Sequence, residues 1–220
     1  MRNSEVKYYY NLLKKKKVSL LLKRIIDIIG GIILLILFSI PLIVIAIIIK
    51  LDSDGPIFYR QERVTSYGKI FHIHKFRTMI NEADKYGTSV TLKNDDRITK
   101  VGIKLREYRL DELPQIFDLI YGNMSFVGTR PEITKYVNQY KPEYMATLLL
   151  PAGITSETSI RFKDESTFLE SADNVDEVYI NDILPVKMKY NLKSIENFSI
   201  LTDMITIYRT IMAVFGKKYN

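Results

Sequence analysis

The sequence contains no cysteine and only two histidines, and both shortages restrict its chemistry. Without cysteine there is no disulfide, no thiolate nucleophile and no cysteine-ligated zinc. His72 and His74 are too few for a histidine-rich metal centre, and their spacing is more typical of two exposed residues on one strand face than of a ligand pair. Any metal is therefore expected to have oxygen ligands, as Mg²⁺ does.

Internal repeats and low-complexity linkers are also missing, so nothing divides the 220 residues into several units. A chain of this length can form one core together with a membrane element. Its net charge of +7 favours a polyanionic partner, such as nucleic acid, an anionic lipid surface or a nucleotide diphosphate. Since neither a basic aromatic platform nor a helix-turn-helix pattern is present, we expect no nucleic acid partner.

Charge is absent from residues 28–49, a run long enough to cross a hydrocarbon layer of about 30 Å as a helix of about 20 residues. Pro41 lies within this run and deletes a backbone hydrogen bond, while Ser39 is close enough to satisfy a freed carbonyl. Both flanks are rich in lysine and arginine, which favours retention of both ends in the cytoplasm. The pattern therefore favours a re-entrant hairpin over a kinked single span. We expect Asp27, at the mouth of the run, to pair at the interface.

The rest of the chain predicts an α+β fold that is mainly helical. Residues 1–22 mix tyrosine and lysine, as an interfacial amphipathic helix does. Residues 57–64 and 69–78 alternate apolar and polar side chains and predict a small β-hairpin. The other expected segments are a polar loop with a short helix at its start (81–100), a turn (151–155) and helices within 101–121, 131–150, 174–190 and 195–215. We expect an interfacial lead-in and re-entrant membrane helix over 1–50, and amphipathic interfacial helices around one catalytic domain over 51–220.

Two adjacent acids, Asp111 and Glu112, are the candidate catalytic residues. A carboxylate can attack phosphorus and hold the phosphoryl group covalently, while a second acid holds Mg²⁺. Adjacent helical residues point about 100° apart, so one acid can face phosphorus and the other can bind metal. The alternative is that Asp111 caps a helix, Glu112 is an ordinary first-turn acid and Pro114 starts that helix.

Basic residues surround these acids and are candidates for binding phosphate, because guanidinium groups form paired hydrogen bonds with phosphate oxygens. Gly128 and Pro131 are expected to shape a tight turn that presents an arginine. The candidate substrate-binding residues are Lys75, Arg77, Arg106, Arg109, Arg130 and Pro131. Lys75 and Arg77 are two apart on the outgoing hairpin strand, so alternation places both on one face. Surface salt bridges and a solvated strand are the alternatives.

A second acidic pair, Asp95 and Asp96, precedes the predicted helical region. Such acids can bind metal, although they more often stabilise turns and helix caps. Both roles stay open for this pair.

Four stretches of the chain resemble the bacterial sugar transferase family, the monotopic phosphoglycosyl transferases. They are "KRIIDIIGGIILLILFSIPLIVIA", "DGPIFYRQERVTSYGKIFHIHKFRTM", "DDRITKVGIKLREYRLDELPQIFDLIYGNMSFVGTRPE" and "PAGIT". The resemblance implies an enzyme that moves a sugar 1-phosphate from a UDP-sugar to polyprenyl (undecaprenyl) phosphate and releases UMP. Such enzymes act on the cytoplasmic face of the bacterial inner membrane and initiate capsule, O-antigen or other surface glycan synthesis.

The family pattern implies roles for individual residues. Asp111 would become a phosphosugar ester and Glu112 would help to hold Mg²⁺. The family's phosphate-binding positions fall on Lys75, Arg106 and Arg130, and its re-entrant helix falls on residues 25–49 with the break near Pro41. A non-enzymatic membrane-surface binding or scaffold module is the competing interpretation.

The chain departs from the family pattern at several points. Thr65 stands where a hairpin-turn glycine is common, so the turn is expected to differ. The segment "GITSETSIRFKDE" replaces the common Gly-Trp-Ala-Gln continuation, and the tail resembles a subgroup with "ILPxKxxxNLxYI". These differences point to a variant donor. The sugar, the glycan pathway and the oligomeric state, including a homodimer, stay open.

Overall fold

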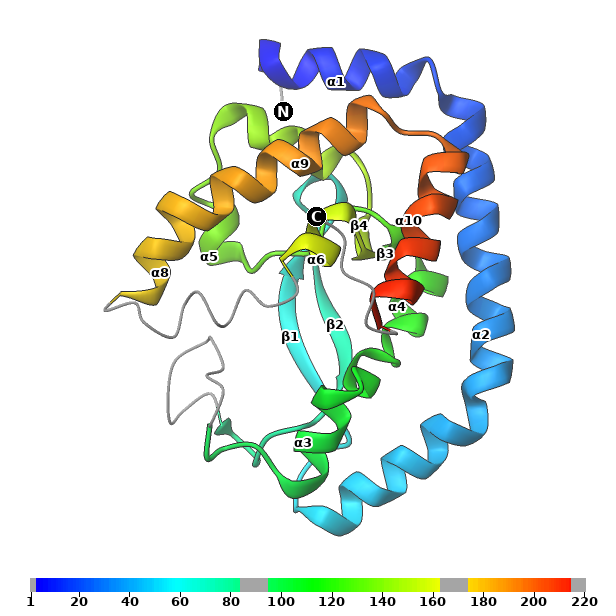
Figure 1. Ribbon diagram of the computed structural model, residues 1–220, viewed down its shortest axis with the longest axis vertical. Helices are drawn as coiled ribbons and strands as arrows, with labels where there is room; N and C mark the ends of the chain where they lie inside the picture. The colour runs from blue at the N-terminus through cyan, green and yellow to red at the C-terminus, as the bar shows by residue number, and fades with distance from the viewer. Residues whose placement is uncertain (1–2, 84–94, 163–173, 215–220) are drawn as a thin grey trace.

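A 36-residue helix, α2 (Lys17–Asp52), forms one side of the molecule in this computed structural model, which describes residues 3–83, 95–162 and 174–214. Figure 1 shows α2 running down that side and turning inward in its lower part. Pro41 lies inside the helix, and the Ser39 hydroxyl donates a hydrogen bond of 2.8 Å to the carbonyl of Ile36. The predicted apolar helix is therefore confirmed.

One face of α2 lies against the rest of the protein along the length of the helix. Its buried residues are Lys23, Asp27, Gly31, Leu42 and Ile49. A Cβ on Gly31 would lie 3.0 Å from the Ile120 side chain, so glycine permits the close approach of α2 to α4 (Gln115–Tyr121). The opposite face is apolar and exposed; Ile36 and Ile40, for example, are 70% and 72% exposed. Only 11% of the most apolar window of α2 is buried, unlike a core helix of a soluble protein.

Within residues 1–22, protein covers the apolar face of the first helix, whereas Val18, Leu21 and Leu22 are exposed, so the interfacial location stays a prediction. Helix α1 (Ser4–Lys14) begins at Asn3, whose side chain caps the Glu5 amide. Val6, Tyr9 and Leu13 are buried in a hydrophobic cluster with residues from η4 (Pro142–Leu149) and α9 (Leu184–Glu196). An amphipathic pattern alone does not distinguish an apolar face that contacts lipid from one that packs against protein.

The β-hairpin is confirmed. Strands β1 (Phe58–Val64) and β2 (Ile70–Phe76) pair antiparallel, with Phe58 opposite Phe76. The left-handed residues of its turn are Tyr67 and Gly68, whereas Thr65 is extended. The Thr65 hydroxyl is buried and donates to the Asn123 carbonyl at 2.6 Å. Thr65 therefore does not adopt the left-handed conformation that favours glycine.

The predicted turn at 151–155 is wrong: residues Ala152–Thr155 form strand β4, parallel to β3 (Met124–Val127). Gly153, within β4, and Gly128, just after β3, explain how the backbones approach. A Cβ on Gly153 would lie 2.2 Å from the backbone of Gly128, so only glycine fits. This small sheet fixes where the chain turns toward Arg130.

Short helices connect these parts. The remaining elements that the structure describes are α3 (Lys100–Glu107), η3 (Leu110–Glu112), α5 (Thr134–Val137), α6 (Glu157–Arg161), α8 (Val175–Val178), η5 (Tyr179–Ile183) and α10 (Ile200–Val214). The helical expectations after residue 100 are confirmed, although 131–150 contains two separate short segments. Most of the predicted polar loop, 84–94, lies outside the described residues. The fold is mainly helical, with a small β-hairpin and one long apolar helix near its N-terminus.

Candidate active site

A single 3₁₀ turn, η3, positions both candidate acids between α3 and α4. Arg109 adopts a left-handed conformation (φ 54°) and redirects the chain after α3. Pro114, as predicted, precedes α4, but no side chain caps that helix. Asp111 therefore does not serve as the N-cap of α4, which removes the simplest structural alternative for this residue.

Glu112 is held by two cations. Lys75 Nζ donates to Glu112 Oε1 at 2.8 Å and Arg130 Nη2 donates to the same oxygen at 2.5 Å. The Glu112 side chain is only 16% exposed. Burial alone would raise its pKa, but Arg130 and Lys75 outweigh burial and hold the pKa well below its usual range. Glu112 is therefore a carboxylate throughout the physiological range.

Asp111 lies in a different electrostatic environment. Burial and the neighbouring Glu112 charge raise its pKa, while Lys75 and Arg106 partly offset that rise. Its negative charge is thus less well compensated than that of Glu112. Two adjacent acids with divergent pKa values are typical of sites in which each performs a different task.

A cavity of about 530 Å³ opens onto Asp111. Its walls come from β1, β2, the segment after β2, and α3. Cationic side chains line it, namely Arg60, Arg63, Lys75, Arg77, Arg97 and Arg106. Two acids, Glu82 and Asp111, line the same cavity, so cations are in excess and favour a ligand with several negative charges, such as a diphosphate.

The structure brings most of the predicted site residues together. Arg109 lies apart, and Arg77 lines the cavity but is bound to backbone carbonyls. Arg109 is exposed and does not line the cavity. The Arg77 guanidinium is buried and donates to the carbonyls of Ser53 (2.6 Å) and Asp54 (2.5 Å), just after α2. Because β2 ends at Phe76, strand alternation no longer orients Arg77. These contacts tie the end of α2 to the hairpin.

Pro131 contributes through its backbone, because its carbonyl accepts a hydrogen bond of 3.1 Å from Arg63. Asp95 forms an ion pair of 2.6 Å with Arg97, which favours a turn role.

Asp27 is buried and accepts a hydrogen bond from the Phe126 amide at 3.0 Å, while Arg24 donates to the carbonyls of Leu119 and Ile120. The start of α2 is therefore fixed to α4 and β3.

The exposure expected for His74 is wrong. His74 is half-buried, and its Nδ1 lies 2.8 Å from Asp118, whose carboxylate also accepts from the His74 amide. Asp118 is 0% exposed. The alternating pattern predicted which face of the strand carries His74. It could not predict that Asp118 of α4 would pack over this face, because nothing in the hairpin sequence indicates that contact.

A buried polar network behind Arg130 was also not predicted. The Tyr179 hydroxyl donates to Glu132, and Lys187 Nζ donates to the Tyr179 hydroxyl at 2.8 Å. Glu132, Tyr179 and Lys187 are all buried. Lys187 belongs to the "ILPxK" part of the tail, so this motif supports the turn that carries Arg130.

Replacing Lys187 with methionine is expected to destabilise the protein by about 3 kcal/mol, because the buried Glu132 charge loses its cation. Urea unfolding measures the change. Lys189→Met, an exposed lysine on the same helix, is the control and is expected to change stability by less than about 0.5 kcal/mol. Equal stability of the two variants would show that the network does not support the turn.

The oxygen donors of the site are compatible with Mg²⁺. Lys75 and Arg130 both donate to Oε1 of Glu112. Neither of these two hydrogen bonds uses the other carboxylate oxygen, Oε2. Among the described residues no group of three or more acids and histidines could enclose a metal. Mg²⁺ commonly binds through one or two carboxylates, with substrate phosphates and water completing its shell. Glu112 and Asp111 fit that pattern.

Comparison of the sequence with known proteins identifies the family. A model described as "Bacterial sugar transferase" matches residues 18–217. The chain belongs to the bacterial sugar transferase family. The match includes α2, the hairpin and the η3 acids, and the exposed apolar face of α2 agrees with membrane association.

Several curated relatives of this sugar transferase are similar over most of the chain. The UDP-N-acetylgalactosamine-undecaprenyl-phosphate N-acetylgalactosaminephosphotransferase of Aeromonas hydrophila is 32% identical over 81% of this chain and 40% of that protein. The UDP-glucose:undecaprenyl-phosphate glucose-1-phosphate transferase of Klebsiella pneumoniae is 36% identical over 83% of this chain and 38% of that protein. The exopolysaccharide production protein ExoY of Rhizobium meliloti is 27% identical over 81% of this chain and 79% of that protein. The chain thus spans about two-fifths of the length of the first two relatives.

Proposed function

We propose that this sugar transferase moves a sugar 1-phosphate from a UDP-sugar to undecaprenyl phosphate and releases UMP. The observation that carries the proposal is the contrast between Glu112, fixed by two cations, and Asp111, which faces a cationic cavity with its charge incompletely compensated. The names of the relatives support the reaction class, since they include transferases that act on undecaprenyl phosphate.

In the first half-reaction the Asp111 carboxylate attacks the phosphorus that carries the sugar. A new aspartyl oxygen–phosphorus bond forms, the bond to the UMP oxygen breaks, and UMP leaves with that electron pair. In the second half-reaction a phosphate oxygen of undecaprenyl phosphate attacks the same phosphorus. The lipid diphosphosugar forms and the Asp111 carboxylate is regenerated.

The surrounding cations position the phosphates and stabilise negative charge. Lys75 and Arg130, which both bind Glu112, and Arg106, in the cavity wall, can neutralise the phosphate oxygens as the bond order changes. When bound, Mg²⁺ supplies further charge neutralisation on the diphosphate. Glu112 is suited to hold it because its carboxylate stays ionised. We expect excess chelator to stop turnover and added Mg²⁺ to restore it.

The decisive experiment uses purified protein, Mg²⁺, undecaprenyl phosphate and a panel of radiolabelled UDP-sugars. Formation of a lipid-linked sugar together with one equivalent of UMP supports the proposal, and the panel identifies the donor. A non-enzymatic scaffold would bind membranes but produce neither product. The initial step of capsule, O-antigen or another surface glycan is the pathway position that this reaction class implies.

We further propose that α2 is re-entrant and that the catalytic domain lies on the cytoplasmic face. The start of α2 is fixed to α4 through Arg24, and its end is close to α3, where the Asp52 carboxylate accepts from the Val101 amide at 3.3 Å. Both ends therefore contact the same domain. A straight single span would place them about 30 Å apart on opposite sides of the bilayer.

Topology can be tested with single cysteines because the chain has none of its own. We expect Lys15→Cys and Lys50→Cys to react with an impermeant maleimide only when it is supplied to inside-out vesicles. Ile40→Cys, on the exposed apolar face beside Pro41, is expected to be protected from both sides. Labelling of the two lysine positions from opposite sides would establish a single span instead.

A further inference from the structure

A second cavity, of about 400 Å³, lies between α6, α9 and α10 beside the turn after β3. Among the residues that the structure describes, it shares no lining side chain with the Asp111 cavity. The turn after β3 is close to both sites, because Gly128 and Thr129 line the second cavity and Arg130 pairs with Glu112. This cavity is therefore separate from the proposed reaction.

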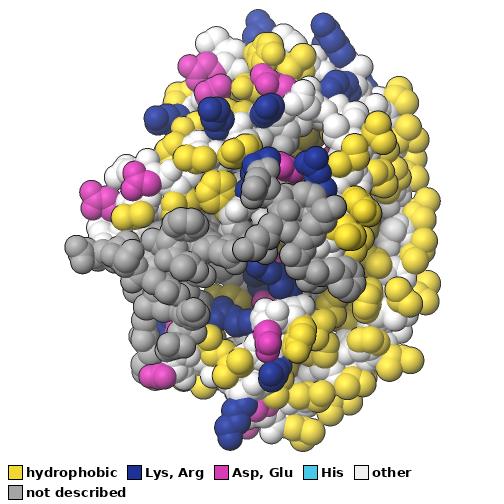
Figure 2. All heavy atoms as spheres, viewed as in Figure 1, with side chains coloured by type: hydrophobic (Ala, Val, Ile, Leu, Met, Phe, Trp, Pro, Cys, Tyr) yellow, Lys and Arg dark blue, Asp and Glu magenta, His cyan; other side chains and the backbone are white. Residues whose placement is uncertain are grey.

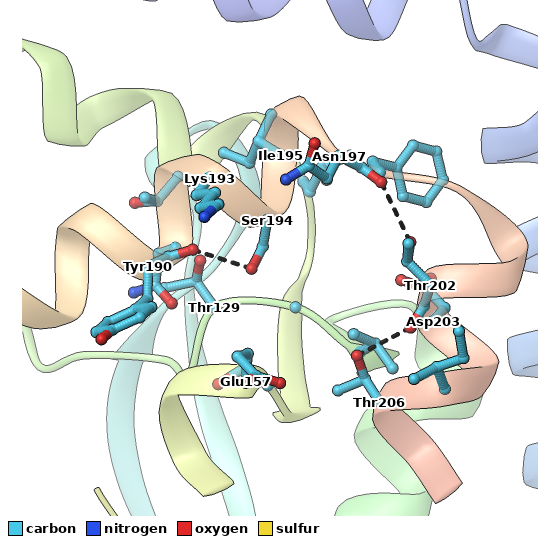
Figure 3. A pocket seen from close by; sticks show the side chains of 18 of the residues that line it. Thr129, Glu157, Tyr190, Lys193, Ser194, Ile195, Asn197, Thr202, Asp203 and Thr206 are labelled. Atoms are coloured by element: carbon cyan, nitrogen blue, oxygen red, sulfur yellow. Dashed lines mark hydrogen bonds between the residues drawn. The ribbon is translucent and has the colours of Figure 1, made fainter. Parts of the chain in front are cut away.

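The lining of the second cavity is rich in hydroxyl and amide groups. Figure 3 shows these side chains gathered around the space, from Thr129 and Ser194 on one side to Thr206 on the other. The Ser194 hydroxyl donates to the Tyr190 carbonyl at 3.0 Å, and the Thr206 hydroxyl donates to the Thr202 carbonyl at 2.9 Å. Hydroxyls bound in this way retain lone pairs that can accept hydrogen bonds from a ligand.

The charged residues of the cavity leave an excess of positive charge. Glu157 is shared by Arg161 at 3.0 Å and Arg209 at 3.3 Å, and Lys193 adds a third cation. Three cations against one carboxylate favour an anionic ligand. The Arg161 guanidinium lies 5.0 Å from the Tyr190 ring centre, which holds it beside the cavity.

The deeper ion pair does not reduce this excess. Lys23 of α2 and Asp203 of α10 form a buried pair of 2.6 Å, and Lys23 also donates to the Val127 carbonyl at 2.8 Å. The pair is neutral as a unit and fixes α10 against α2. The attraction for an anion therefore comes from the outer cations.

One edge of the cavity meets an exposed apolar surface. Ile205 lines the cavity and is 43% exposed, and it belongs to the outer face of α10 together with Leu201 and Tyr208. Figure 2 shows apolar side chains continuing over this side of the molecule toward α2. A ligand whose anion is bound by Arg161 and Lys193 can therefore extend an apolar part along α10, as an amphiphile does.

We propose that this second cavity binds the head group of an anionic phospholipid at the edge of the membrane. Arg161 and Lys193 bind the phosphate, the hydroxyl and amide lining receives the polar head group, and the acyl chains follow the apolar face of α10. The cationic rim distinguishes phosphatidylglycerol from zwitterionic lipids, because the latter carry a compensating positive charge.

Tyr190→Trp provides a specific reporter, because the chain contains no tryptophan. The protein is titrated in neutral detergent with short-chain phosphatidylglycerol, short-chain phosphatidylcholine and inorganic phosphate. We expect a saturable fluorescence change with phosphatidylglycerol and apparent affinities at least about tenfold weaker for the other two. Native mass spectrometry of the wild-type protein counts bound phosphatidylglycerol independently of the tryptophan substitution.

Charge variants locate the bound lipid. Arg161→Gln and Lys193→Gln are each expected to weaken phosphatidylglycerol binding about tenfold, whereas Lys189→Gln on the same helix leaves it unchanged. Asp111→Asn is also expected to leave it unchanged, which separates this site from the proposed reaction. Equal binding of phosphatidylcholine overturns the preference for an anionic head group, and equal binding of inorganic phosphate indicates a free-anion site. Insensitivity to both charge variants, or loss of binding in Asp111→Asn, places the lipid elsewhere.

Discussion

Asp111→Asn is expected to abolish product formation, by at least about 10⁴-fold, while the protein remains as stable as the wild type or becomes more stable. The loss of activity follows from the proposed covalent step, because an amide cannot form the aspartyl phosphate ester. Radiolabelled lipid product and UMP measure turnover, and thermal unfolding measures stability.

The stability effect follows from the direction of the pKa shift. Burial and Glu112 raise the pKa of Asp111 in the folded protein above its unfolded value. Below the unfolded pKa the carboxyl is neutral in both states, and above the folded pKa its ionisation costs more in the folded protein than in the unfolded chain. Asparagine removes this cost at neutral pH. The Tm of the variant is therefore expected to equal or exceed that of the wild type.

Asp96→Asn is the matched control, since Asp96 is an exposed acid at the approach to α3. It is expected to retain activity and to change stability by less than about 0.5 kcal/mol. Full activity of Asp111→Asn would exclude Asp111 as the nucleophile. Inactivity accompanied by a large fall in Tm would instead indicate that Asp111 mainly supports the fold.

Patterns that act within one segment were predictable from the sequence. Alternation defined the hairpin, the absence of charge defined α2, and Pro114 located the start of α4 after the acids. Each feature depends on neighbours within a few residues, so the local sequence carries the signal. Lys75 was a candidate from the strand pattern and from the family resemblance, but its pairing with Glu112 was not predicted.

Features that depend on distant partners were not predictable. Strand β4 consists of four residues, including alanine and glycine, which have low strand propensity, and its pairing depends on β3. The direction of Arg77 depends on where β2 ends and on the carbonyls of Ser53 and Asp54. Likewise, Lys187 approaches Glu132 from 55 residues away. Tertiary packing decides all three.

Glu112→Gln is expected to destabilise the protein, in contrast to Asp111→Asn, although the two substitutions are chemically equivalent and adjacent. Lys75 and Arg130 lose the carboxylate that neutralises them. Removing one partner of a fully buried pair costs about 3–5 kcal/mol, and because the Arg130 side chain is 37% exposed we expect about 2 kcal/mol. Urea unfolding of the two variants under identical conditions tests the difference in sign.

If the proposed roles hold, the same substitution reduces kcat/KM by about 10²–10³-fold, because it would disorder the two proposed phosphate-binding cations and remove the proposed Mg²⁺ ligand. Glu112 also helps to raise the pKa of Asp111, so its neutralisation lowers that pKa. The acidic limb of the residual kcat/KM profile should therefore move to lower pH, since ionised Asp111 persists further into acid. An unchanged acidic limb would mean that another group, such as a substrate phosphate, controls it. A shift in the predicted direction, combined with opposite stability effects, would assign the nucleophilic role to Asp111 and the charge-organising role to Glu112.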